Sequence, residues 1–204
     1  MRRHAPERHV AKLLLLPVLL VAGCLASGLY GALHNQISYT VSPEYFHAFK
    51  FHQFDIPAQF HNRIGAAIVG WYASWWMGVF IGMPVLLFGL ILPGWRTYLS
   101  CCLTAFGVIA ATALLVGLAA LVYASSVIPE PSPIEFWYGE RLQDPAAFMR
   151  SGTMHDFSYL GGFLGIVTGS LYLLIARVRI ALAARGAASR QTVERVPAAP
   201  EGIS

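Results

Sequence analysis

The sequence predicts an all-helical, polytopic membrane protein with four transmembrane helices. Only 12% of its 204 residues are charged, about half of the roughly 25% usual in soluble domains. A helix needs about 20 apolar residues to cross the hydrocarbon core of a bilayer. Four stretches of at least that length carry no charge: residues 13–33, 64–92, 97–127 and 157–176. This much apolar surface excludes a soluble domain, a disordered tail and a small disulfide-stapled secreted module.

The placement of the basic residues predicts the orientation of the chain. If it crosses four times, ten of the fourteen Lys and Arg residues fall on one side. These are Arg2, Arg3, Arg8, Lys12, Arg96, Arg177, Arg179, Arg185, Arg190 and Arg195. Because positively charged segments stay cytoplasmic, we expect residues 1–12 and 179–204 inside a bacterial cytoplasmic (inner) membrane and the loops 34–63 and 128–156 outside. The arginines of the tail are scattered among Ala, Gly and Pro, which favours a topology anchor over nucleic-acid binding.

The first transmembrane helix is expected over residues 13–33. The segment VAGC that ends at Cys24 follows a basic start and a leucine-rich run, so it resembles a bacterial lipoprotein cleavage box. The apolar run continues beyond Cys24 and is longer than the core of a signal peptide, roughly 7–15 residues. An uncleaved helix is therefore favoured, and the lipoprotein alternative stays open.

The other transmembrane helices are expected over residues 64–92, 97–127 and 157–178. Pro84 predicts a kink in the second helix that neighbouring helices repair, and the Pro-Gly pair at 93–94 predicts a tight inner turn. Small residues recur at intervals of four in three of the helices, which allows helices to approach closely. These stripes predict a compact bundle, or contacts with other membrane subunits or a second copy. They consist of Gly23, Ser27 and Gly31; Ser74, Gly78 and Gly82; and Gly161, Gly165 and Gly169.

Each outer loop is expected to hold short interfacial helices. Residues 42–44 place a cap residue, a proline and an acid at the start of a helix that continues to about residue 51. This helix is strongly aromatic, which is typical of a segment lying in the membrane interface. In the second loop, residues 132–135 form a capping box and residues 144–145 start a further turn. Residues 153–156 form a looser capping box that predicts the start of the last helix.

Side chains of the metal-ligand type collect on the outer side. His34 lies at the exit of the first helix and His155 at the entrance of the last, so four alternating crossings bring both to one depth. Glu44 and His47 share one face of the short helix because they are three residues apart. Imidazole and carboxylate together are ligands for zinc, copper or iron. We therefore predict a metal site of His34, Glu44 and His155. Additional members are His47 as a further ligand and Tyr45, Asp156 and Tyr159 as supporting residues.

The same residues have other interpretations. Two histidines on facing helices can hold haem b, and imidazoles can relay protons. His34 can instead point toward lipid headgroups, Glu44 is favoured in a first helical turn by the helix macrodipole, and Asp156 can act as a cap. A di-iron bundle needs several more carboxylates inside the bundle, so that interpretation of the Glu-x-x-His pair is excluded. The four stretches also lack the charges that mark ion paths, so we expect no transport by the isolated monomer.

Two short blocks resemble a known family. Residues 33–46, LHNQISYTVSPEYF, resemble the signature of an uncharacterised family of small bacterial inner-membrane proteins with four spans, and residues 155–162, HDFSYLGG, resemble its second block. Together the blocks cover about a tenth of the chain. The resemblance implies the four-span plan but no reaction. The site residues that it highlights are His34, Glu44, Tyr45 and His155.

The sequence therefore predicts a non-catalytic integral membrane component that binds a metal ion or a partner through His34, Glu44 and His155. One alternative is a membrane redox or enzyme subunit that uses the same histidines for haem b or a catalytic metal. Another is a purely structural subunit of a membrane complex. Whether the chain is an enzyme stays open at this point.

Overall fold

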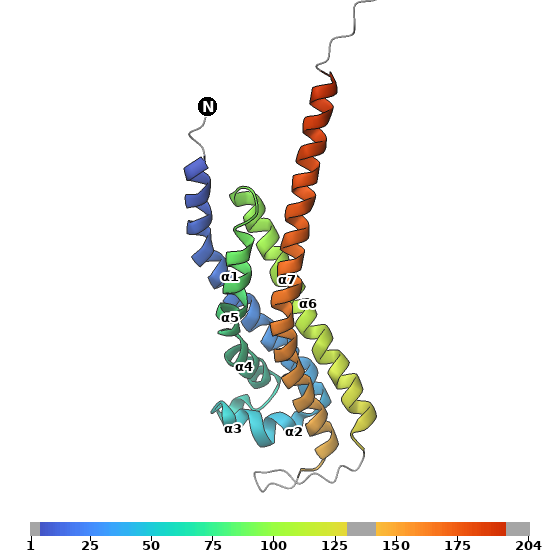
Figure 1. Cartoon of the computed structure of the whole chain (residues 1–204). Coiled ribbons are helices and arrows are strands. Elements are labelled where there is room, and N and C mark those ends of the chain that lie inside the picture. Colours follow the sequence, from blue (N-terminus) through green and yellow to red (C-terminus); the bar gives the residue numbers. More distant parts are fainter. Residues whose placement is uncertain (1–4, 130–141, 195–204) are drawn as a thin grey trace, which may run out of the picture.

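The computed structural model describes residues 5–129 and 142–194, and within these ranges the chain is helical, without strands. The bundle is formed by α1 (Ala5–Val41), α4 (Arg63–Ser74), α5 (Met77–Gly89), α6 (Trp95–Val127) and α7 (Pro145–Glu194), as Figure 1 shows. Four short elements connect α1 to α4. They are α2 (Pro43–Tyr45), the π-helix η1 (Phe46–Lys50), α3 (Phe51–Gln53) and the 3₁₀-helix η2 (Ala58–Phe60).

Three segments of the described chain are long and apolar enough to cross a membrane: Val10–Val41, Trp95–Val127 and Pro145–Gln191. The α4–α5 pair reaches the same standard only when it is taken as one segment, which is bent by 47°. The bend lies at residues 75–76, between the two helices, whereas α5 runs through Pro84 without a break. The kink expected at Pro84 is therefore found earlier in the chain. The all-helical, membrane-spanning character of the protein agrees with the prediction.

Helix α1 is longer than predicted at its C-terminal end. The sequence predicts a loop from residue 34 onward, yet the helix continues to Val41. The amide of Asn35 donates to the carbonyl oxygen of Ala66 at 2.9 Å, and that of Gln36 to the carbonyl oxygen of Arg63 at 3.1 Å. Polar side chains that suggest a loop in the sequence thus bind the backbone of the neighbouring helix α4, and α1 can continue.

Helix α7 likewise begins earlier than predicted, at Pro145. A carboxylate oxygen of Asp144 accepts a hydrogen bond from the N–H of Ala147 at 2.9 Å, which is the bond expected of a residue that caps a helix. Thr153, predicted to open the last helix, lies inside α7 and donates to the carbonyl of Met149 at 2.9 Å. The capping box predicted at residues 132–135 lies outside the described residues.

The small-residue stripes pack helices of this chain against one another. A Cβ atom added to Gly161 of α7 would lie 2.8 Å from the Cα atom of Ala113 in α6. The backbones of Gly31 in α1 and Gly70 in α4 touch, so a side chain on either residue would overlap the other helix. A Cβ atom on Gly78 would lie 2.5 Å from the backbone of α1. These close approaches agree with the predicted compact bundle.

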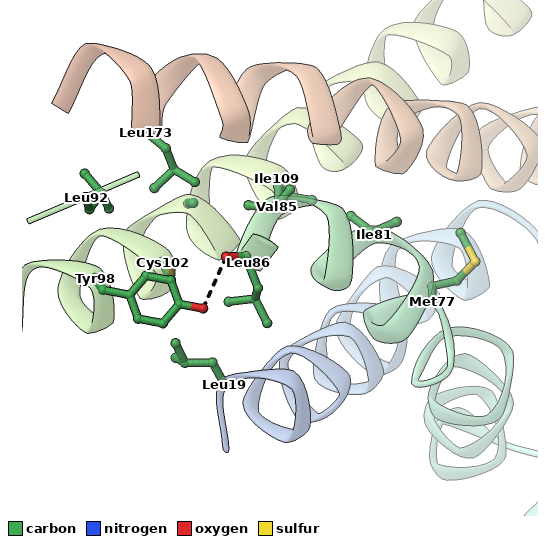
Figure 2. Packing of buried hydrophobic residues seen from close by; sticks show 11 residues of the cluster. Leu19, Met77, Ile81, Val85, Leu86, Leu92, Tyr98, Cys102, Ile109 and Leu173 are labelled. Atoms are coloured by element: carbon green, nitrogen blue, oxygen red, sulfur yellow. Dashed lines mark hydrogen bonds between the residues drawn. The ribbon is translucent and has the colours of Figure 1, made fainter. Parts of the chain in front are cut away.

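The largest apolar core lies among α1, α5, α6 and α7, and Figure 2 shows its side chains. Val85 and Leu86 of α5 are fully buried between Tyr98 of α6 and Leu173 of α7. The hydroxyl of Tyr98 donates to the carbonyl oxygen of Leu86 at 3.2 Å. This bond satisfies the polar group of the tyrosine, so the ring can be buried at little cost.

Two cations hold the end of α5. Lys12, assigned from the sequence to the cytoplasmic segment 1–12, lies within α1 and is buried. Its ammonium donates to the carbonyl oxygens of Leu90, at 3.1 Å, and Leu92. Arg177 of α7 donates to the carbonyl oxygen of Ile91 at 3.1 Å. The carbonyl groups at a helix C-terminus lack intrahelical partners and carry partial negative charge, so these contacts join α1, α5 and α7.

The described ends of the chain lie at one end of the bundle. In Figure 1, the start of α1 and the end of α7 are both at the top, whereas α2, α3 and the start of α7 are at the bottom. We call the end with α2 and α3 the outer end. The histidines of the predicted site belong to the half of the bundle near this outer end.

Candidate functional site

The structure brings two of the three predicted ligands together. His34 of α1 and His155 of α7 are buried, with 4% and 7% of their surfaces exposed. Their ring centroids are 4.9 Å apart, and the rings meet edge to face at 87°. Both residues lie inside long helices rather than at helix ends. Their meeting agrees with the topological reasoning that placed them at one depth.

Each histidine binds a serine on the other helix. Nε2 of His34 is 2.8 Å from the hydroxyl of Ser158 in α7, and Nε2 of His155 is 2.9 Å from the hydroxyl of Ser38 in α1. Both serines are buried. Ser38 is not among the predicted site residues, because the sequence pattern places it in a loop. The spacing of the two residues on α1 could have indicated that Ser38 belongs to the site, since His34 and Ser38 are four residues apart and share one helical face if the helix continues.

An aromatic layer packs against His155 at the outer end. The ring of Tyr45 lies 5.1 Å from that of His155, and the ring of Phe46 lies 6.1 Å from it. Both aromatic residues are buried, and they belong to a cluster that also contains Phe51 and Phe148. We call this cluster the outer aromatic cluster; its buried members are Tyr45, Phe46, Phe51, Ile56, Ala66, Val69 and Phe148. Through Tyr45 and Phe46 this cluster contacts the imidazole pair at His155.

Charged groups lie beside this cluster. Burial raises the pKa of Tyr45, and the nearby Asp156 and Tyr159 raise it further. Burial lowers the pKa of Lys50, and the attraction of Asp156 partly opposes this change. The ammonium of Lys50 lies 4.6 Å from the ring centroid of Phe49. Asp156 itself is exposed, so the predicted supporting residue acts from the rim of the site rather than on the imidazole pair.

Glu44 has a different role in the structure from the one predicted. Its two carboxylate oxygens accept hydrogen bonds from the backbone N–H groups of Gln143, at 2.7 Å, and Asp144, at 2.9 Å. These groups immediately precede α7, where a carboxylate is electrostatically favourable. No three His, Cys, Asp or Glu side chains of residues 5–129 and 142–194 are placed to share a metal ion. The predicted grouping of His34, Glu44 and His155 around one ion is therefore not formed.

His47 lies in a second group of histidines on the outer surface. Its Nε2 atom is 3.1 Å from the hydroxyl of Tyr39, and its ring centroid is 5.9 Å from that of His61. His61 stacks on Phe51 at 4.6 Å and bonds through Nε2 to the carbonyl oxygen of Ile56 at 2.8 Å. Burial lowers the pKa of His47, and the nearby His61 lowers it further. The ring contacts attach these histidines to the outer aromatic cluster.

A cavity of about 100 Å³ opens beside the histidine pair. It lies among α1, α5, α6 and α7, with Ser74 of α4 contributing to one wall. Its polar lining consists of Tyr30, His34, His155, Ser158 and Tyr159, which belong to the parts of α1 and α7 nearer the outer end, together with Ser27 and Ser74. Its other walls are mostly apolar and small, and they include Gly23, Gly78, Gly82, Phe106, Ala110 and Gly162.

The hydroxyl of Tyr30 is a polar group of this cavity without a hydrogen bond of normal geometry to any atom of the described chain. Its oxygen is buried. Ser158 lies close to it, and the Ser158 hydroxyl is also bonded to His34. The ring of Tyr30 lies 5.7 Å from that of His34. Imidazole, serine and tyrosine groups together can hold the polar end of a ligand whose body is apolar.

Comparisons with known proteins give no relative for this chain: no family model, no curated protein and no solved structure matches it. The resemblance of residues 33–46 and 155–162 to a family of small inner-membrane proteins stays a prediction. The function must therefore be argued from the imidazole pair and the cavity beside it.

Proposed function

We propose that the protein crosses a bacterial cytoplasmic membrane four times, with the α4–α5 pair as one bent span. Both termini are then cytoplasmic, and the outer aromatic cluster faces the periplasm. This proposal is supported by the basic residues near both termini and by the position of the two described ends of the chain at the same end of the bundle. A reporter fused after residue 204 that is active only in the cytoplasm would agree with it, and one active only in the periplasm would contradict it.

We further propose that the protein binds a small lipid-soluble molecule in the cavity, with the polar end of this molecule at His34 and His155. The observation that carries the proposal is the buried imidazole pair at the polar end of an otherwise apolar cavity. Ligand sites are concave and mostly apolar, and a few polar groups fix the orientation of the ligand. Because the walls belong to membrane-spanning segments, a molecule dissolved in the lipid is the natural occupant.

The donor set fits a metal ion less well. Structural and catalytic zinc sites use three or four protein ligands, whereas two imidazoles meet here. Two histidines are enough to hold haem b, but these two rings are in edge-to-face contact at 4.9 Å, which leaves no space for a haem between them. Nε2 of each ring is bonded to a serine, so coordination through these atoms would break both bonds. Glu44, the third predicted ligand, binds backbone groups ahead of α7. A metal ion on the imidazole pair is the competing proposal, and the test below separates the two.

The test compares two glycine substitutions with opposite relations to the cavity. A Cβ atom on Gly82 would have Phe106 as its nearest neighbour, at 3.8 Å, so Gly82→Leu fits the helix and fills the cavity. A Cβ atom on Gly107 meets open space, so Gly107→Leu adds the same volume outside the bundle. Both variants should unfold near the temperature of the wild type. Each is reconstituted in lipid nanodiscs and titrated with decylbenzene and with decanophenone.

Thermal unfolding is followed with a thiol-reactive dye, which reports exposure of the free residues Cys24, Cys101 and Cys102. A molecule that binds the folded state raises the unfolding temperature. We expect this rise in the wild type and in Gly107→Leu, and its loss in Gly82→Leu. An equal rise in all three proteins would refute binding in the cavity. A stoichiometric transition metal that co-purifies with the wild type and is lost from His34→Ala and His155→Ala would favour the metal proposal instead.

A further inference from the structure

We infer that the polar end of the bound molecule is a carbonyl oxygen that accepts a hydrogen bond from the hydroxyl of Tyr30. This inference rests on the proposed function, because it names the chemical class of the ligand that the cavity holds. It is carried by the arrangement of donors and acceptors at the polar end of the cavity.

The amide of Asn35 fixes the protons of the neighbouring groups. Its Nδ2 atom donates to the carbonyl oxygen of Ala66 at 2.9 Å, so its oxygen is the atom that faces Nδ1 of His34, at 3.5 Å. An amide oxygen only accepts hydrogen bonds, which favours the tautomer of His34 with its proton on Nδ1. Nε2 of His34 is then an acceptor, and it takes the proton of the Ser158 hydroxyl at 2.8 Å.

Within the described chain, the hydroxyl of Tyr30 is the donor of this network without a hydrogen bond of normal geometry. Its oxygen is buried and makes no such bond, although Ser158 lies close to it. A buried donor without a partner is costly, so a ligand that supplies an acceptor gains binding free energy there. A carbonyl oxygen carries lone pairs and no proton, which makes it complementary to a free donor. A hydrocarbon of the same shape would leave the cost unchanged.

The dimensions of the cavity suit about one ring. An engineered apolar cavity of about 150 Å³ holds benzene, and this cavity of about 100 Å³ is somewhat smaller, so a long chain would have to extend beyond it. The Tyr30 and His34 rings bound its polar end, and Gly82 and Phe106 belong to its apolar walls. A lipid-soluble aromatic or quinonoid ketone would place its carbonyl at Tyr30 and its ring against the apolar walls.

The test uses three aromatic molecules of similar length: decanophenone has a carbonyl group between ring and chain, decylphenol has a hydroxyl group on the ring, and decylbenzene has neither. Their dissociation constants are measured in nanodiscs for the wild type, for Tyr30→Phe and for Tyr123→Phe. Tyr123 lies on the outside of α6 with 65% of its surface exposed, so it provides a control for the loss of a tyrosine hydroxyl. Tyr30→Phe removes an unpaired hydroxyl and should fold normally.

We expect Tyr30→Phe to weaken decanophenone binding about five- to tenfold, as the loss of one hydrogen bond predicts, and to leave decylbenzene binding unchanged. Tyr123→Phe should change neither. Equal binding of decanophenone to Tyr30→Phe and to the wild type would overturn the inference. Tighter binding of decylphenol than of decanophenone, with the Tyr30→Phe effect confined to decylphenol, would also overturn it by assigning a hydroxyl head. The Gly82→Leu result tests the cavity itself, so either failure can be recognised separately.

Discussion

Ser38 of α1 and His155 of α7, 117 residues apart in the sequence, share a buried hydrogen bond of 2.9 Å. His34 of α1 and Ser158 of α7 repeat this pairing in the reverse sense at 2.8 Å. Each helix thus contributes one imidazole and one hydroxyl to a pair of cross-links. Because α1 lies near the start of the chain and α7 near its end, these bonds also join helices that are far apart in the sequence.

Replacing Ser38 should destabilise the protein through the imidazole that it leaves behind. Ser38→Ala removes the hydroxyl bonded to His155, and a buried polar group without a partner costs about 1–3 kcal/mol. We expect a lower free energy of unfolding by about that amount. The measurement is the unfolding equilibrium of the purified protein in mixed micelles. Ser126→Ala, which removes an exposed hydroxyl of α6, should change the free energy far less.

A double-mutant cycle gives this prediction a stricter form. If the bond between Ser38 and His155 carries the effect, Ser38→Ala should cost less in a His155→Ala background than in the wild type. If the losses in free energy of unfolding were additive, the two residues would stabilise the fold separately, and the hydrogen bond between them would not contribute to stability.

The contact between Gly31 and Gly70 predicts a sharp intolerance to added volume. Gly70→Ala would place a methyl group against the backbone of Gly31, and backbone cannot move aside as a side chain can. Overpacking typically costs about 1–3 kcal/mol, and we expect the upper part of this range. Gly107→Ala, with no atom within 4 Å of its added Cβ, is the matched control. The yield of folded protein and the unfolding temperature measure both, and a normal Gly70→Ala protein would show that α1 and α4 do not pack this closely.

The sequence was sufficient to predict the meeting of His34 and His155, because alternating crossings bring the outer ends of the first and last helices to one depth. It was misleading about the length of these helices. Asn35 and Ser38 are polar, and polar residues after an apolar run usually indicate a loop. Here both are buried between helices, with the amide of Asn35 bonded to a carbonyl of α4. Hydropathy cannot distinguish a polar residue in water from one that is buried and bonded.

The role of Glu44 was also beyond the reach of sequence patterns. Side-chain type suggested a metal ligand, but the carboxylate binds two backbone N–H groups about a hundred residues away. Backbone donors have no signature in the sequence, so only the fold reveals this partner. The same holds for Lys12, which looks like a topology signal and instead binds the carbonyl groups at the end of α5.

The position of Glu44 makes a prediction about the start of α7. Glu44→Ala removes both acceptors from Gln143 and Asp144, so these amides should exchange their hydrogens faster. Exposed charged contacts contribute at most about 1 kcal/mol, which corresponds to roughly fivefold faster exchange. Hydrogen exchange followed by mass spectrometry measures this in residues 142–150, and Glu44→Gln should fall between the alanine variant and the wild type.

The same variant should leave ligand binding at the imidazole pair intact, because Glu44 is engaged elsewhere. If Glu44→Ala abolished binding of decanophenone while α7 kept its exchange protection, the carboxylate would belong to the site after all. That result would restore the grouping of His34, Glu44 and His155 that the sequence suggests.

The outer aromatic cluster should lose stability on acidification through His47. Burial and the neighbouring His61 lower the pKa of His47 below its ordinary value, about 6.5 in an unfolded chain. Between these two pKa values the unfolded chain binds more protons than the folded chain, so acid favours unfolding. The stability that His47 contributes is therefore complete above pH 6.5 or so and decreases as the pH falls toward the lowered pKa.

The measurement is the difference in unfolding temperature between the wild type and His47→Gln from about pH 7.5 to about pH 5. Glutamine cannot be protonated in this range, so the wild type should lose more stability than the variant as the pH falls. His61→Gln should weaken the dependence only in part, because the charge of His61 is the smaller of the two causes and burial of His47 remains. Parallel curves for the wild type and His47→Gln would mean that His47 titrates alike in the folded and unfolded chains, and the acid sensitivity of the outer end would have to come from other groups.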